Sequence, residues 1–142
     1  MSTIDELSGI CAERNPDPAD QRRRLIARLK GGVDIHAADK NGVTALHHAV
    51  RFRCPIAVRT LIEHGANVNQ ICRKSGSMPL HRAVTQTGAP GTAGRGQEAI
   101  EIIRLLIAAG ADPSIINKLG RKPADYVKDD ATRALLNARR HQ

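Results

Sequence analysis

Histidine is the residue type in this sequence best suited to chemistry near neutral pH, because imidazole can bind a metal or transfer a proton. His47 and His81 occupy matching positions, thirty-four residues apart. The other candidates, His36, His48 and His64, have no Asp, His or Cys partner at the spacing that metal ligands keep. We therefore predict no metal site and no cofactor.

Motifs for other catalytic chemistry are missing as well. Residues 91–96 are rich in glycine, but they lack the lysine and the preceding strand of a phosphate-binding loop. The cysteines, Cys11, Cys54 and Cys72, are odd in number and form no C-x-x-C pair, which favours reduced, buried thiols over disulfides or a zinc site. The sequence predicts that the protein is not an enzyme.

The elements that carry the two histidines repeat along the chain. Residues 42–50 return as residues 76–84, and a period of this length is typical of stacked structural repeats. A second motif, which begins with glycine and is followed by alternating polar and apolar residues, starts at Gly32, Gly65 and Gly110. The pattern predicts a single domain built as an array of similar units.

Local signals place helices within each unit. We expect helices over 3–13 and 20–30, followed by a short extended hairpin over 33–42. Thr44 is the expected N-cap of a helix that ends where residues 53–55 include a proline, and a second helix should then run to the next glycine.

The next unit repeats this order with one change. Pro79 stands in the first turn of its first helix, where a missing N–H is tolerated. Comparison with the preceding unit shows eleven extra residues, and the segment 85–97 contains glycines and a proline without apolar periodicity. We predict a mobile surface loop there.

These motifs resemble the ankyrin repeat. The resemblance lies in Thr44 to His47, in Pro79 to His81, and in the Gly-Ala pairs at 65–66 and 110–111. It implies an α-helical solenoid of about four units with short β-hairpin loops. The units are an N-terminal cap (1–39), a repeat (40–72), a repeat with the inserted loop 85–97 (73–117) and a C-terminal cap (118–142). The chain departs from the pattern at Ala45, Met78, Lys122 and Asp125.

The resemblance also implies roles for particular residues. The matching histidines of the family bond the backbone between neighbouring units, so His47 and His81 are expected to be structural. Family members usually bind proteins on a concave side formed by the hairpin tips and the first helices. The residues of this chain that match such positions are Lys40, His48, Arg51, Phe52, Arg73, Lys74, Arg82, Gln86, Lys118, Arg121 and Tyr126.

Charge indicates what kind of partner this surface would take. The net charge is +8, and residues 40–97 hold eight basic side chains against one acidic side chain. We expect a protein partner with an acidic surface, bound in a salt-dependent way. Two alternatives are nucleic acid or another polyanion on the same basic face, and an inhibitor or immunity-type protein that acts through the inserted loop. Few aromatic residues argue against nucleic acid.

Two features have competing interpretations. Phe52 and Tyr126 could be binding anchors, or they could pack inside their own units. The run 22–24 of three arginines could be a localisation signal or a nucleic-acid patch, but a solvated helix face is favoured because acidic residues stand beside it. An acidic N-terminus and no apolar run of roughly 20 residues favour a soluble, cytoplasmic protein, with export as an effector left open. We also expect the chain to be monomeric by itself.

Overall fold

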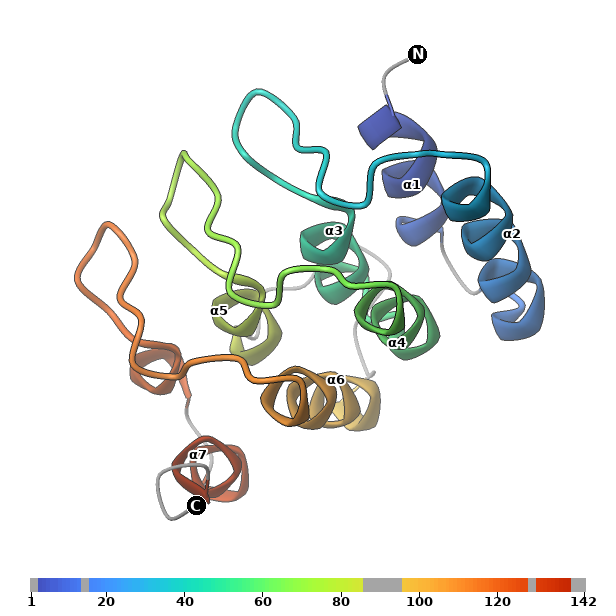
Figure 1. Cartoon of the computed structure of the whole chain (residues 1–142). Helices are drawn as coiled ribbons and strands as arrows, with labels where there is room; N and C mark the ends of the chain where they lie inside the picture. The colour runs from blue at the N-terminus through green and yellow to red at the C-terminus, as the bar shows by residue number, and fades with distance from the viewer. Residues whose placement is uncertain (1–2, 14–15, 86–95, 128–129, 139–142) are drawn as a thin grey trace.

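A computed structural model describes residues 3–13, 16–85, 96–127 and 130–138. Its helices follow one another in pairs along a stack (Figure 1). The bounds are α1 (Thr3–Cys11), α2 (Pro18–Lys30), α3 (Ala45–Arg51), α4 (Pro55–Glu63), α5 (Pro79–Val84), α6 (Gly96–Ala108), the 3-10 helix η1 (Pro123–Tyr126) and α7 (Asp130–Ala138).

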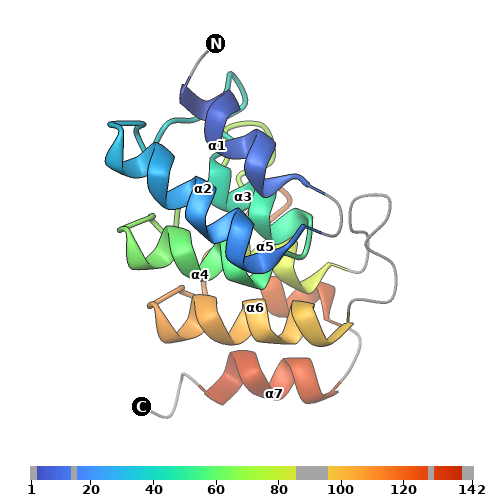
Figure 2. The ribbon, with the colours of Figure 1, turned by 90° about the vertical axis from the view of Figure 1, so that its right-hand side faces the viewer.

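The helices form two layers. The inner layer contains α1, α3, α5 and η1, each in contact with the next, and the outer layer contains α2, α4, α6 and α7. Figure 2 shows the outer helices stacked one below another. Three loops, at residues 38–43, 71–77 and 116–121, project from the same side of the stack (Figure 1). We call these loops the tips.

The core between the layers is made from small and medium aliphatic side chains. In α3 and α4 the inward positions are fully covered, with Ala49, Val50, Ala57 and Leu61 all inaccessible to solvent. Spacings of three and four residues place such side chains on one face of each helix. The three cysteines are buried free thiols, as expected.

The extended hairpin expected over 33–42 is reduced to one isolated bridge, between Ala38 and Thr44. The described residues contain no longer ladder, because local acceptors take the amides that a ladder would pair. The Asp39 carboxylate accepts from the amides of Asn41 and Val43, at 2.8 and 3.0 Å. Two backbone bonds close this tip, from the Asp39 amide to the Val43 carbonyl and from the Gly42 amide to the Asp39 carbonyl.

Helix ends differ slightly from expectation. The first helix ends at Cys11, and the second begins at Pro18, since proline is well suited to a first helical turn. The helix after the insertion already begins at Gly96, so the last two residues of the segment 85–97 are helical. Residues 86–95, for which a mobile loop was expected, lie outside the described residues.

Arg53 stabilises the junction between two units. Its backbone lies in the left-handed region, with φ of 58°, which ends α3 sharply before Pro55. Its guanidinium is buried and donates to the carbonyl oxygens of Ala83 and Thr85, at 3.0 and 2.8 Å. These carbonyls lie at the C-terminal end of α5, where helices leave acceptors unpaired and favour a positive charge.

The contacts of Arg53 predict a large effect of its removal. Arg53→Ala should lower the free energy of unfolding by about 2 kcal/mol, because buried carbonyls lose charge-assisted donors. Arg51→Ala, two residues away and exposed, should change it by less than about 0.5 kcal/mol. Urea denaturation followed by circular dichroism measures both. Equal effects of the two substitutions would contradict this role for Arg53.

Candidate functional site

The first helix of each inner unit begins with a polar arrangement centred on a buried histidine. His47 Nδ1 accepts from the Thr44 amide at 3.1 Å, and the Thr44 hydroxyl lies 3.5 Å from the His47 amide in a reciprocal cap. The opposite ring nitrogen, Nε2, donates to the Ser77 carbonyl of the following unit at 3.2 Å. This pattern of bonds assigns the proton to Nε2.

The same arrangement recurs in the next unit and changes in the last. His81 Nδ1 accepts from the Met78 amide at 3.2 Å, and Nε2 donates to the Arg121 carbonyl at 2.9 Å. In the last unit Asp125 accepts from the Lys122 amide at 2.8 Å. A carboxylate keeps the local cap but has no donor for an onward bond. The structural role expected for both histidines is confirmed.

Burial favours the neutral form of both imidazoles, those of His47 and His81. Desolvation is the main cause that lowers the pKa of His47 to about 4, with nearby Arg82 adding to it. Desolvation also lowers the pKa of His81, although its bond to the Arg121 carbonyl and nearby Asp125 act in the opposite direction. Both rings are therefore neutral at neutral pH, as their acceptor bonds require.

Neighbouring tips are bonded directly to each other. The amide of Arg73 donates to the Asn41 carbonyl at 2.6 Å, and the amide of Lys118 donates to the Ser75 carbonyl at 2.9 Å. Gly42 has φ of +77°, and a side chain there would place its first carbon 2.7 Å from the Arg73 nitrogen. The tips therefore present their side chains from one continuous backbone framework.

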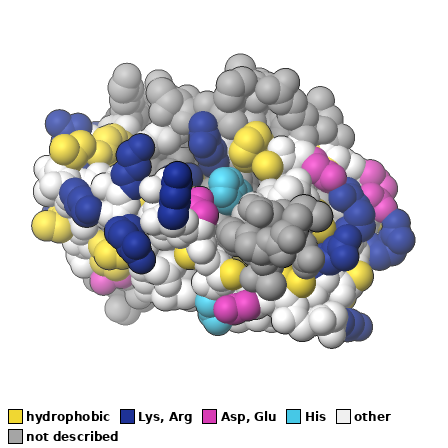
Figure 3. All heavy atoms as spheres, turned by 90° about the horizontal axis from the view of Figure 1, so that it is seen from above, with side chains coloured by type: hydrophobic (Ala, Val, Ile, Leu, Met, Phe, Trp, Pro, Cys, Tyr) yellow, Lys and Arg dark blue, Asp and Glu magenta, His cyan; other side chains and the backbone are white. Residues whose placement is uncertain are grey.

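We call the surface formed by the three tips together with α3, α5 and η1 the tip face. The basic residues predicted to bind a partner lie on it, and those on the tips point to solvent. The members of that prediction that are exposed are Lys40, Arg51, Arg73, Lys74, Lys118 and Arg121. Figure 3 looks down on this side and shows Lys and Arg side chains spread over its left half, with few acidic side chains between them.

Three predicted residues form a group where the repeat 40–72 meets the repeat 73–117. His48 and Arg82 are half-buried, and burial followed by the charge of Arg82 lowers the pKa of His48. Arg51 lowers it further, while Asp39 raises it. Burial disfavours the charged form of Asp39 too, but the amides of Val43 and Asn41 outweigh this and lower the pKa of its carboxyl. The structure thus brings His48 and Arg82 close to the Asp39 carboxylate, with Arg51 close to His48.

The two aromatic residues are both half-buried. Phe52 follows α3 and packs against the core. The Tyr126 hydroxyl accepts from the Asn117 side chain at 2.8 Å, and its ring meets His81 edge-on at 6.4 Å between centroids. The Arg121 guanidinium lies 5.7 Å from the centre of the Tyr126 ring. Tyr126 therefore supports the last tip, and binding by either aromatic residue stays a prediction. Gln86 lies outside the described residues.

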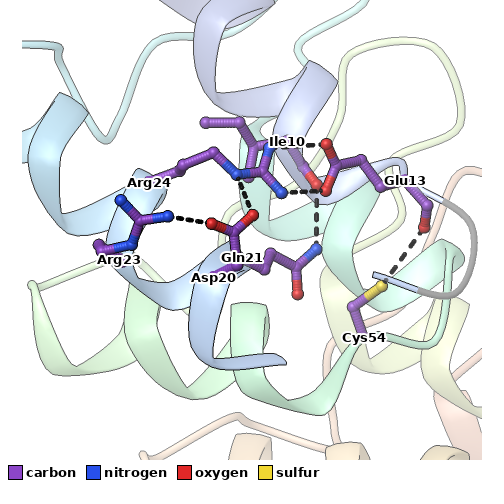
Figure 4. A network of polar contacts seen from close by, with 7 residues as sticks. All are labelled: Ile10, Glu13, Asp20, Gln21, Arg23, Arg24 and Cys54. Carbon is purple, nitrogen blue, oxygen red and sulfur yellow. Dashed lines mark hydrogen bonds and ion pairs between the residues drawn. The ribbon is translucent and has the colours of Figure 1, made fainter. Parts of the chain in front are cut away.

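The run of three arginines belongs to a different surface and is ion-paired. Arg24 binds Glu13 through two nitrogens, at 2.6 and 2.7 Å, and binds Asp20 at 2.8 Å (Figure 4). Arg23 pairs with the same Asp20, and Arg22 reaches Glu63 on α4 at 2.7 Å. These pairs favour a structural interpretation of the run over a nucleic-acid patch.

Sequence reasoning missed two features. The exposed aliphatic side chains of Ile71, Ile116 and Leu119 lie on the tips beside the basic residues. A cleft of about 510 Å³ lies at another edge, where α2, α4 and α6 meet the turn before Pro55.

Among the described residues, no group of three or more His, Cys, Asp or Glu could hold a metal ion, and no helix could cross a membrane.

Comparisons with known proteins agree with this architecture. A family model described as ankyrin repeats, in three copies, matches residues 10–117. The chain is 31% identical to the human BCL-6 corepressor-like protein 1 over 113 residues, which cover 80% of this chain and 6% of that protein. It is 29% identical to the human B-cell lymphoma 3 protein over 156 residues, covering 87% of this chain and 34% of that protein.

A solved structure gives the same result. The crystal structure of the ankyrin repeat domain of Bcl-3 superposes with a TM-score of 0.69 and 30% identity, over 84% of this chain and 47% of that chain. The chain therefore spans about a third or less of the two relatives, and about half of the crystallised domain.

The buried imidazoles predict a loss of stability in acid. The pKa of His47 is about 4 in the folded chain and about 6.5 when unfolded, so the unfolded state takes up the proton first. Its contribution is complete above about pH 6.5 and is lost as the pH falls toward about 4. Between about pH 7 and about pH 5 the free energy of unfolding should drop by about 2 kcal/mol from His47, with His81 acting in the same direction.

Urea denaturation at a series of pH values tests this prediction. His47→Gln should give a shallower pH dependence than the wild-type chain, whatever its absolute stability. His36→Gln, which alters an exposed histidine outside these bonds, is the matched control and should keep the wild-type slope. An unchanged slope for His47→Gln would show that the buried imidazole does not couple stability to pH.

Proposed function

Because this chain belongs to the ankyrin repeat family, we propose that it is a non-catalytic binding module that holds a partner protein with an acidic surface on the tip face. Repeats of this family mediate protein–protein interactions. The main support for an acidic partner is the set of exposed basic residues on the tips and on α3. The binding residues are those of the tip face, including the half-buried His48, Phe52, Arg82 and Tyr126.

Charge separation within the molecule supports this choice of surface. The arginines of α2 are ion-paired with Glu13, Asp20 and Glu63, and Arg59 on α4 lies 3.4 Å from Glu101. In contrast, residues 71–77 and 116–122 contain five basic side chains and no acidic one. Unneutralised charge of one sign speeds the approach of an oppositely charged partner and selects against like-charged ones.

The preorganised backbone of the tip face also supports the choice of this surface as the binding site. The tips are tied by backbone bonds to Asn41 and Ser75, and the first helices are tied to the following units by His47 and His81. A surface that is already ordered loses little conformational freedom when a partner binds. The fixed part of the face is backbone, so partner selectivity would depend on the side chains that it carries.

Charge reversal tests the proposed face. The triple variant Arg51→Glu, Arg73→Glu, Arg82→Glu should weaken binding to a partner captured by the wild-type chain by at least about tenfold, because attraction becomes repulsion. The measurement is affinity capture followed by titration of the purified partner at low and high salt. A matched triple on the outer layer, Arg28→Glu, Lys30→Glu, Arg104→Glu, should retain binding, since these exposed residues lie away from the tip face.

The outcome also separates the alternatives. Equal binding by both triple variants would contradict the assignment of the face. Capture of DNA or RNA in place of a protein, with log-linear weakening by salt, would favour the polyanion alternative. The inhibitor or immunity-type alternative depends on the segment 85–97, so unchanged binding after deletion of residues 88–95 would remove it.

A further inference from the structure

Large aliphatic side chains stand exposed at the last two tips. The exposed fractions are 49% for Ile71, 58% for Ile116 and 73% for Leu119, and the described residues contain no other exposed large hydrophobic side chain. Isolated surface hydrophobics are common and need no explanation. Here all three fall on two adjacent loops, and such grouping is typical of a contact surface.

The two isoleucines occupy equivalent places. Each directly precedes the residue whose amide closes its tip, Cys72 in one tip and Asn117 in the next. The bond from the Lys118 amide to the Ser75 carbonyl fixes one tip against the other at 2.9 Å. The aliphatic side chains are therefore presented together from a rigid framework.

Basic side chains surround this aliphatic group. Arg73 and Lys74 are exposed on one tip, and Lys118 and Arg121 are exposed on the other. Figure 3 shows hydrophobic and Lys or Arg side chains next to one another at the left end of the view, the end where Figure 1 places the last tip. The right half of Figure 3 differs, because basic side chains lie beside acidic ones there.

This combination restricts the chemistry of the occupant. A uniformly charged polyanion would pair with the basic residues but would leave the aliphatic side chains without an apolar contact. A purely apolar segment would cover the aliphatic side chains but would leave four charges unpaired. A segment that carries both kinds of side chain satisfies both sets, since apolar contact supplies the centre of an interface and charges supply its rim.

We propose that the tips at residues 71–77 and 116–121 bind a segment of the partner protein in which aliphatic or aromatic side chains are interspersed with Asp and Glu. The apolar side chains contact Ile71, Ile116 and Leu119, and the carboxylates pair with Arg73, Lys74, Lys118 and Arg121. This inference rests on the proposed function, and it narrows the tip face to two of its three tips.

A random dodecapeptide library displayed on phage is the probe for this inference. Selection on the full chain should recover peptides that hold both acidic and large apolar residues. The strongest peptide is then synthesised beside a version with serine at each apolar position, which keeps its charge. Fluorescence anisotropy should show at least tenfold tighter binding of the parent peptide to the wild-type chain.

The variant Ile71→Ser, Ile116→Ser, Leu119→Ser should lose that tenfold preference while its melting temperature stays unchanged, because the replaced side chains are exposed. The control Ala108→Ser, Ala134→Ser changes exposed apolar residues of the outer layer and should keep the preference.

Three results would overturn the inference: selected peptides that are acidic but lack apolar residues, no selected peptide at all, or full preference retained by the triple serine variant. The first would leave the proposed function standing. Selected peptides without acidic residues would instead contradict the proposed function itself.

Discussion

The structure depends on a buried imidazole that joins each inner unit to the next one. His47 and His81 each accept from an amide at the start of their own helix and donate to a carbonyl of the following unit. Only a neutral histidine offers an acceptor and a donor on opposite sides of one rigid ring. The helix start, the position of the next tip and the spacing of the units are therefore set by one side chain.

The tips follow from this constraint. Ser77 and Arg121 stand at the base of the second and third tips. The histidine bonds therefore hold the second tip against the repeat 40–72 and the third tip against the repeat 73–117. Gly42 and Gly76, both with positive φ, allow the backbones to approach closely enough for direct bonds between tips. The side chains that remain, mostly basic and aliphatic, take no part in this framework and are available to a partner.

Much of this architecture could be predicted from the sequence, because its signals are local and repeated. The cap at Thr44, proline at the first turn of α5 and the structural roles of His47 and His81 are confirmed. The extent of the hairpin pairing was overestimated. Alternating apolar residues do not reveal that the Asp39 carboxylate accepts hydrogen bonds from the amides of its own tip.

Other features depended on contacts between distant residues. A charge count treats Arg53 like any other surface arginine, whereas its buried guanidinium bonds carbonyls thirty and thirty-two residues away. The exposure of Ile71 and Ile116 was equally hidden, because no periodic pattern distinguishes an aliphatic residue on a tip from one in a core. The position of the predicted basic residues was accessible only through the register of the repeats.

The central claim is that a partner protein binds to the tip face. Chemical-shift mapping of the backbone amides tests it most directly, with the isotope-labelled chain titrated by a partner protein captured from cells. The account predicts that the largest changes fall on residues 71–77 and 116–122 and on α3 and α5. Changes centred instead on the cleft beside Pro55, Glu98 and Glu101, with the tips unaffected, would contradict it.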